Sequence, residues 1–126
     1  NFINQIINKN DITVYGDGSQ TRSFSYVDDT IDGIYKVLKS KYNLPVNIGN
    51  PEEYSINELV NILKKHMPNS CKIVYLNLPE NDPKVRKPDI NLARTILDWY
   101  PKITLERGLK KTIDYFYNSV WGKFYY

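Results

Sequence analysis

Apolar residues recur at the three- and four-residue spacing of a helix in five stretches of the chain. The expected helices cover residues 2–7, 27–38, 55–67, 89–97 and 104–120. In the second of these helices the apolar face consists of Val27, Ile31, Ile34 and Leu38. The first helical pattern begins at Phe2 with no capping residue before it, which predicts that the sequence starts inside a helix, as a fragment would.

Three of these helices carry start signals. Ser55 and Glu58 form the Ser-x-x-Glu pattern of a capping box, in which each side chain satisfies a backbone N–H of the other residue. Asp89 and Thr104 precede the last two helical patterns, and we expect both to act as caps because their side-chain oxygens accept from free N–H groups.

Short runs rich in β-branched and aromatic residues predict strands between the helices. They cover residues 11–15, 23–26, 45–49 and 72–76. Residues 16–19 (Gly-Asp-Gly-Ser) form a turn signal between the first two runs, which predicts a small hairpin. Together with the helices, these strands predict one α/β domain over residues 1–126.

Composition and charge exclude several classes of protein. The chain has 126 residues, 41% hydrophobic and 25% charged, which fits one globular domain. A net charge of +3 without a long basic run does not favour a nucleic-acid partner. No apolar run approaches the roughly 18 residues of a membrane span. A single cysteine, Cys71, excludes an internal disulfide framework and favours a reducing compartment, so we expect a cytoplasmic protein.

The sequence contains no complete catalytic apparatus. A single histidine, His66, excludes the common His-based metal sites and catalytic triads, and we expect it on a helix surface without a partner. Cys71 has no histidine nearby and is expected to be a structural thiol. No Gly-x-Gly-x-x-Gly turn follows a strand and no P-loop is present. We therefore predict no catalytic, metal-binding or cofactor-binding residues in this chain.

Residues 14–22 combine an aromatic ring, glycine-rich backbone and a guanidinium in one short segment. A ring such as that of Tyr15 can stack on a nucleobase. An arginine such as Arg22 is a preferred bidentate partner of phosphate. The alternative interpretation is a plain hairpin with a buried tyrosine and a solvated arginine.

Two further segments are candidates for ligand binding. Residues 82–89 hold three cations between two prolines just before a helix, which suits an anion such as a pyrophosphate. The alternative is a charged surface loop in which Asp82 and Asp89 neutralise their neighbours. Residues 47–51 end an expected strand in a sharp turn, where ligands of open sheets often bind, although a purely structural turn explains them equally well.

Residues 14–29, 47–53 and 78–90 together resemble the second half of an extended short-chain dehydrogenase/reductase that acts on nucleotide sugars. The loop 78–90 is most similar to that of the UDP-glucuronate decarboxylases, which make UDP-xylose. The likeness extends from Asn1 to about residue 117. It implies an α/β fold, namely the C-terminal substrate-binding region of a Rossmann-type enzyme with short strands and four to five helices.

The resemblance also implies that substrate binding and cofactor binding are carried out by different parts of a longer protein. Members of this family bind NAD on an N-terminal Rossmann half that carries a Tyr-x-x-x-Lys pair. They oxidise the sugar at C4, release CO2 and reduce the product again with the same NADH. None of that half is present in this sequence. We therefore expect the chain alone to be inactive, the NAD to be bound by the missing half, and the full-length protein to be a homodimer.

Eight residues match substrate-binding positions of the family. Asn1 and Phe2 match positions that lie against the diphosphate of the UDP-sugar. Thr13, Val14 and Tyr15 match the segment that frames the uracil and the ribose, with the tyrosine near the base.

The other three matching residues are polar or cationic. Gln20 and Arg22 match positions that reach the ribose and the phosphates, and Arg86 matches the second arginine that grips the pyrophosphate. Two arginines on two phosphates are physically reasonable because charge-assisted hydrogen bonds are stronger than neutral ones.

Two alternatives remain open. The chain shares its Tyr-Gly-x-Gly…Arg segment with dTDP-glucose 4,6-dehydratases and related nucleotide-sugar epimerases, so it is also consistent with a region of one of those. The other alternative is a non-catalytic remnant that scaffolds or regulates a partner. The remnant predicts weak or absent nucleotide affinity and an exposed apolar patch.

Overall fold

The computed structural model describes residues 1–67, 71–79, 83 and 85–121. In chain order the elements are α1 (Phe2–Ile7), β1 (Ile12–Tyr15), β2 (Thr21–Ser23), α2 (Val27–Lys39), β3 (Glu53–Ser55), α3 (Ile56–His66), β4 (Ile73–Leu76), α4 (Asn91–Leu97), α5 (Leu105–Tyr115) and the π-helical segment η1 (Phe116–Trp121). The five expected helices are all present. The last one changes from α-helix to π-helix at Phe116.

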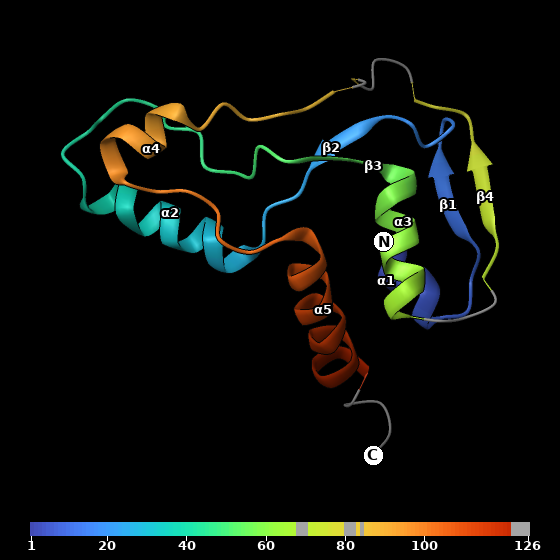
Figure 1. Ribbon diagram of the computed structural model, residues 1–126. Coiled ribbons are helices and arrows are strands. Elements are labelled where there is room, and N and C mark those ends of the chain that lie inside the picture. The colour runs from blue at the N-terminus through green and yellow to red at the C-terminus, as the bar shows by residue number, and fades with distance from the viewer. Residues whose placement is uncertain (68–70, 80–82, 84, 122–126) are drawn as a thin grey trace.

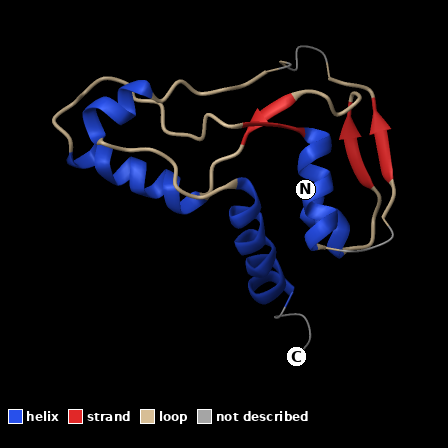
Figure 2. Ribbon diagram, viewed as in Figure 1, coloured by secondary structure: helices blue, strands red, loops and turns tan. Residues whose placement is uncertain are grey.

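The strands form two separate two-stranded sheets in the described residues, so the predicted hairpin is wrong (Figure 2). β1 pairs in parallel with β4, and Ile12 lies opposite Ile73. β2 pairs antiparallel with β3, and Arg22 lies opposite Tyr54. The turn after β1 therefore connects two sheets. Sequence patterns around residues 11–26 could not reveal this, because both partner strands lie far along the chain.

Residues 45–49 were expected to form a strand, and this prediction is also wrong within the described part of the chain. The segment is extended but has no ladder partner there. Val46 and Ile48 pack instead against a small buried cluster around Trp99. Their apolar character therefore serves side-chain packing in this chain and not sheet pairing.

The described residues contain two hydrophobic clusters, one at each end of the molecule (Figure 1). The larger one joins α1, β1, α3 and α5, and its buried members are Ile3, Ile6, Ile12, Val14, Leu59, Val60, Leu63, Met67, Cys71, Leu105 and Ile113. The smaller one contains Ile90, Ala93 and Trp99 and lies near α2 and α4. The β2–β3 ribbon runs between the two ends.

The apolar face of α2 lies at the surface, although its pattern is that of a buried face. Val27, Ile31, Ile34 and Leu38 are 55%, 58%, 50% and 77% exposed. The helix buries its opposite side, where Asp29 and Gly33 lie. A Cβ at Gly33 would come within 2.5 Å of Ile48 Cγ2, so only glycine permits this close approach.

The caps predicted at Ser55 and Thr104 are confirmed, whereas the predicted cap at Asp89 is wrong because Ile90 is the N-cap of α4. The Ser55 hydroxyl accepts from the Glu58 N–H at 3.1 Å, and the Glu58 carboxylate accepts from the Ser55 N–H at 2.7 Å. The bond from the Ser55 N–H, and after it a bond in which the Ser55 hydroxyl donates to the same carboxylate oxygen at 2.8 Å, lower the pKa of Glu58. Thr104 Oγ1 accepts from the N–H of Arg107 at 3.4 Å. Asp89 lies one residue before the N-cap of α4, and its carboxylate accepts from the N–H of Asn91, the first residue of that helix, at 2.9 Å.

His66 has a partner, which corrects the expectation of a surface histidine without one. Its side chain is only 16% exposed, and Nε2 lies 2.8 Å from Glu106 Oε1. A carboxylate only accepts, so Nε2–H donates this bond. Lys65 Nζ lies 3.1 Å from the same oxygen. Glu106 therefore connects the end of α3 to the start of α5.

This connection makes the stability of the chain depend on pH. Hydrogen bonds from Lys65 and then His66 lower the pKa of Glu106 in the folded chain. A carboxyl with a lowered pKa stabilises the fold above its unfolded pKa of about 4.3, and this stabilisation disappears as the pH falls through the folded value. We expect Glu106→Gln to be less stable than the wild type at about pH 7, and we expect this difference to shrink as the pH falls below about 4.3.

Urea unfolding of both proteins across this pH range measures the effect. Asp114→Asn is a matched control, because Asp114 lies on the same helix and forms no ion pair with a described residue. A stability difference between Glu106→Gln and wild type that stays constant throughout the acid range would contradict the prediction.

Candidate functional site

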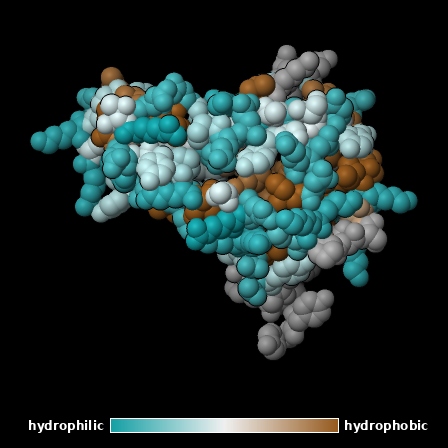
Figure 3. Space-filling model, viewed as in Figure 1, coloured by the Kyte–Doolittle hydropathy of each residue, from teal (hydrophilic) through white to brown (hydrophobic). Residues whose placement is uncertain are grey.

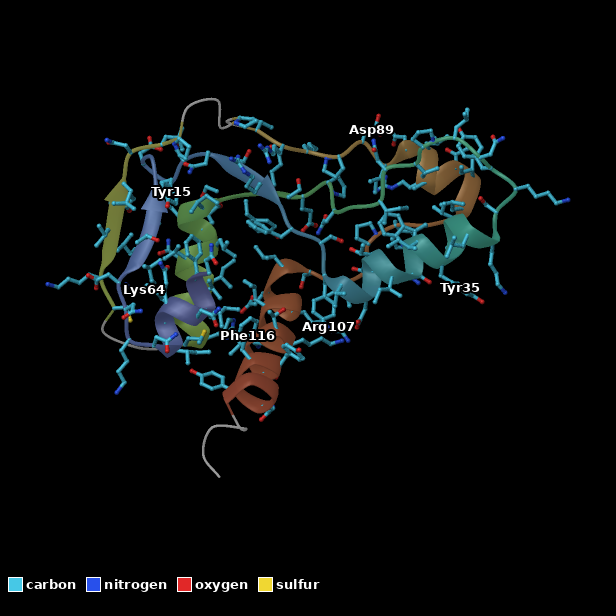
Figure 4. All side chains as sticks on the ribbon, turned by 180° about the vertical axis from the view of Figure 1, so that it is seen from behind. Tyr15, Tyr35, Lys64, Asp89, Arg107 and Phe116 are labelled. Carbon is cyan, nitrogen blue, oxygen red and sulfur yellow. The ribbon has the colours of Figure 1, made fainter. Side chains whose placement is uncertain are left out.

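A cleft of about 640 Å³ opens between α1, β1, β2 and the start of α3. Its lining residues are Asn1, Phe2, Gln5, Thr13, Tyr15, Gln20, Arg22, Phe24, Ile56 and Leu59. Six of these ten belong to the eight substrate-binding positions predicted from the sequence. The fold thus brings most of the predicted positions to one place, at the end of the molecule where Figure 4 labels Tyr15.

Gln5 is a lining residue that the sequence analysis missed. Its amide Nε2 donates to Thr13 Oγ1 at 2.8 Å, and its Oε1 accepts from the Thr13 N–H at 3.2 Å. This pair of hydrogen bonds fixes α1 against β1. The available signal was helical spacing, since a residue three positions after Phe2 shares its face of the helix.

The alternation of β1 decides which of its residues reach the cleft. Thr13 and Tyr15 line it, while Val14 between them is fully buried in the larger core. Successive side chains of a strand point to opposite faces, so the Val14 side chain lies behind the cleft wall. The ring of Tyr15 is 49% exposed, which corrects the alternative interpretation of a buried tyrosine.

The turn between β1 and β2 is held against the first turn of α3. The amide of Asn57 donates to the Asp17 carbonyl at 2.9 Å, and its backbone N–H donates to the Gly18 carbonyl at 3.1 Å. Gly18 has a φ of +75°, and a Cβ there would collide with the Asn57 side chain. Gln20 Nε2 donates to the carbonyl of Tyr15 at 2.6 Å, which orients both residues at the cleft.

Arg22 is the one charged side chain among the ten lining residues. It lies on β2, and its Nη1 donates to the carbonyl of Thr21 at 2.7 Å. Phe2, Phe24, Ile56 and Leu59 give the cleft apolar walls, and the remaining lining residues add polar side chains. A cleft with aromatic and aliphatic walls and one guanidinium suits an anionic ligand that also carries a flat ring.

Arg86 does not line this cleft, although the sequence predicts it to act together with Arg22. It is exposed in the extended segment that leads to α4. The contacts that hold this segment include an ion pair between Lys87 Nζ and Glu53 Oε2 at 3.3 Å and a bond in which Asn47 Nδ2 donates to the Asp89 carbonyl at 3.1 Å. Part of the predicted anion-binding loop, residues 82 and 84, lies outside the described residues.

Tyr54 lies opposite Arg22 in the β2–β3 ribbon and is a neutral neighbour of the site. Burial raises the pKa of Tyr54, and so does the bond in which its hydroxyl donates to Glu52 Oε2 at 3.0 Å. The phenol therefore stays protonated at neutral pH, and Tyr54 adds no negative charge beside Arg22.

The described residues do not form a dinucleotide-binding turn. β1 leads through residues 16–20 into a second strand and not directly into a helix, so the strand–turn–helix unit of a dinucleotide-binding site does not form at the end of β1. Across the described ranges no cluster of three or more metal-ligating side chains exists. None of the helices seen there has the length and apolarity to cross a bilayer.

Curated sequences that resemble this chain are UDP-glucuronic acid decarboxylases. Decarboxylase 1 of Danio rerio is 44% identical over 116 residues, which cover 92% of this chain and 28% of the relative. Decarboxylase 1 of Arabidopsis thaliana is 41% identical over 120 residues, which cover 95% of this chain and 28% of the relative. The chain thus spans little more than a quarter of the length of these relatives.

Solved structures of nucleotide-sugar epimerases share the fold. UDP-glucuronic acid 4-epimerase from Bacillus cereus, solved with UDP-glucuronic acid and NAD, superposes with a TM-score of 0.85 at 34% identity, covering 93% of this chain and 38% of the epimerase. UDP-glucose 4-epimerase from Thermotoga maritima, solved with UDP-glucose, gives a TM-score of 0.85 at 27% identity, covering 94% of this chain and 38% of that protein. The family profile for GDP-mannose 4,6-dehydratase matches residues 1–112. The chain therefore belongs to the GDP-mannose 4,6-dehydratase family of extended short-chain dehydrogenases/reductases that act on nucleotide sugars.

Proposed function

We propose that this chain forms the UDP-binding part of a UDP-glucuronate decarboxylase. One observation carries the proposal: six residues predicted from the sequence line a single cleft in which Arg22 is the one charged side chain. Its volume of about 640 Å³ lies within the usual range for a small-molecule site, roughly 300–1,000 Å³.

Each part of UDP has a counterpart in this cleft. The half-exposed ring of Tyr15 offers a stacking surface for uracil. Thr13 and Gln20 bring polar atoms to the ribose, and Asn1 and Phe2 lie on the diphosphate side. Arg22 contacts the phosphates, because a planar guanidinium binds two phosphate oxygens at once.

The chemical steps belong to the rest of a longer protein in this proposal. The chain spans 28% of the Danio rerio decarboxylase, and β1 in this chain does not lead into a dinucleotide-binding turn. NAD, when bound by the remainder of the protein, supplies the hydride transfer. The residues of this chain bind and orient the UDP group, and the whole protein acts as a homodimer.

Heteronuclear NMR of the chain during titration with UDP tests the proposal. We expect the amide resonances of Tyr15, Gln20 and Arg22 to shift, while those of exposed residues on α4 at the other end of the molecule do not. No shift at millimolar UDP would contradict the proposal. Tighter binding of dTDP than of UDP would instead favour a dTDP-glucose 4,6-dehydratase.

The non-catalytic remnant remains the second candidate because the apolar face of α2 is exposed, as that candidate predicts. The same exposure is expected if another part of a longer protein covers α2. Nucleotide affinity therefore distinguishes the two candidates, since the remnant predicts little or none.

A further inference from the structure

The two arginines that the sequence predicts to bind the pyrophosphate lie on separate segments of the chain. Arg22 belongs to β2, which lines the cleft, and Arg86 belongs to the extended segment before α4. The two phosphates of a diphosphate are adjacent. Both cations can therefore bind them together only if the two segments are held at a fixed separation.

Glu53 contacts both segments with one carboxylate. Its Oε1 accepts a hydrogen bond from Thr21 Oγ1 at 2.9 Å, and its Oε2 lies 3.3 Å from Lys87 Nζ. Thr21 directly precedes Arg22, and Lys87 directly follows Arg86. Each oxygen of Glu53 thus reaches the neighbour of one arginine.

The backbone of Glu53 is itself fixed in the ribbon. It is the first residue of β3 and lies opposite Ser23 of β2. Its side chain is 28% exposed, less than that of Lys87 at 52%, so the carboxylate is the more buried partner of the pair. The bond from Asn47 to the Asp89 carbonyl also holds this segment but does not reach β2.

We propose that Glu53 is a positioning residue that sets the separation of Arg22 and Arg86 for binding a nucleoside diphosphate. The ligand in this statement rests on the proposed function. Without the Lys87–Glu53 contact, the segment that carries Arg86 must lose conformational freedom when the ligand binds, and affinity falls for that reason. A partly exposed ion pair contributes only modestly to the free energy that holds two segments together, so we expect a small loss of affinity. The loss should be specific to ligands that carry the diphosphate.

The variant Glu53→Gln tests this role, because glutamine still accepts from Thr21 but no longer attracts Lys87. We expect the dissociation constant for UDP to rise about two- to fivefold. The affinity for uridine, which lacks phosphates, stays unchanged. Glu52→Gln is the matched control, because the Glu52 carboxylate accepts from the Tyr54 hydroxyl and contacts neither arginine segment in the described part of the chain. It should leave both affinities at the wild-type value.

A double-mutant cycle shows whether Glu53 acts through Arg86. In an Arg86→Ala background, Glu53→Gln should have no further effect on UDP affinity. A general loosening of the ribbon would instead weaken UDP and uridine alike, and the loss would persist in that background. Either of those results would overturn the proposal.

A ligand-free measurement separates this proposal from the proposed function. Backbone relaxation should show faster motion of residues 85–90 in Glu53→Gln than in the wild type. If the wild type binds no UDP but this motion increases, the proposed function fails and the positioning of the segment by Glu53 stands. If the motion is unchanged, Glu53 does not position the segment and the proposal fails.

Discussion

Replacing Trp99 with alanine is expected to lower the free energy of unfolding by about 3–5 kcal/mol. The indole is 1% exposed and forms the centre of the smaller core with Ile90 and Ala93. Truncation would leave a cavity that neighbours fixed in helices and tight turns fill only partly. It would also remove the bond in which Nε1 donates to the Asp29 carbonyl at 3.2 Å.

The loss is expected to extend beyond the cavity because Asp29 organises the chain that follows Trp99. The Asp29 carboxylate accepts from the backbone N–H groups of Lys102 and Ile103 at 3.1 and 2.9 Å. Asp29 is 6% exposed, so a displaced carboxylate there would remain buried with fewer partners.

Urea unfolding followed by far-UV circular dichroism measures this change without relying on tryptophan fluorescence. Tyr100→Ala is the matched control, since the neighbouring Tyr100 is 52% exposed and its removal should cost no more than about 0.5 kcal/mol. If Trp99→Ala were as stable as this control, the smaller core would not contribute to the cooperative fold.

Arg22→Ala is expected to weaken UDP binding about ten- to a hundredfold, which corresponds to the roughly 1.5–3 kcal/mol of hydrogen bonds to charged groups. Arg22 is the one charged side chain in the cleft lining, so no other lining residue replaces its charge. Uridine should bind the variant nearly as well as it binds the wild type, because the proposed contacts to the base and the ribose involve Tyr15, Thr13 and Gln20 and not Arg22.

Two further variants control this experiment. Arg22→Lys keeps the charge but loses the planar fork, and should therefore recover only part of the affinity. Arg94→Ala removes an exposed cation on α4, away from the cleft, and should leave binding unchanged. Isothermal titration with UDP measures all three variants, and equal affinity of Arg22→Ala and wild type would remove the arginine from the site.

The helices could be predicted from the sequence because their signals are local. The capping box at Ser55 and the cap at Thr104 are formed by residues three positions apart, and both are present as predicted. Strand pairing is not local. β1 pairs with the strand that begins at Ile73, and β2 pairs with the strand that contains Tyr54. A short-range sequence pattern therefore predicted a hairpin that does not form.

The candidate site could be predicted where it follows from the family resemblance and from the alternation of side chains along β1. Six of the eight predicted positions meet at the cleft, and their role in binding a ligand stays a prediction. Gln5 was missed because its importance arises only when α1 docks on β1 and its amide pairs with Thr13. Glu53 could not be found either, because its two contacts join residues 21 and 87, which come together only in the folded chain.

Apolar side chains at the surface also determine how the chain behaves in solution. Figure 3 shows hydrophobic atoms at the surface over β1 and β4, where Val74 and Leu76 are partly exposed, and α2 exposes a further apolar face. Hydrophobic attraction weakens on cooling and strengthens in sulfate. Self-association through these faces should therefore increase in warm, sulfate-containing buffer. Cold, sulfate-free buffer is therefore the appropriate medium for the titrations, because self-association through these faces is weakest there.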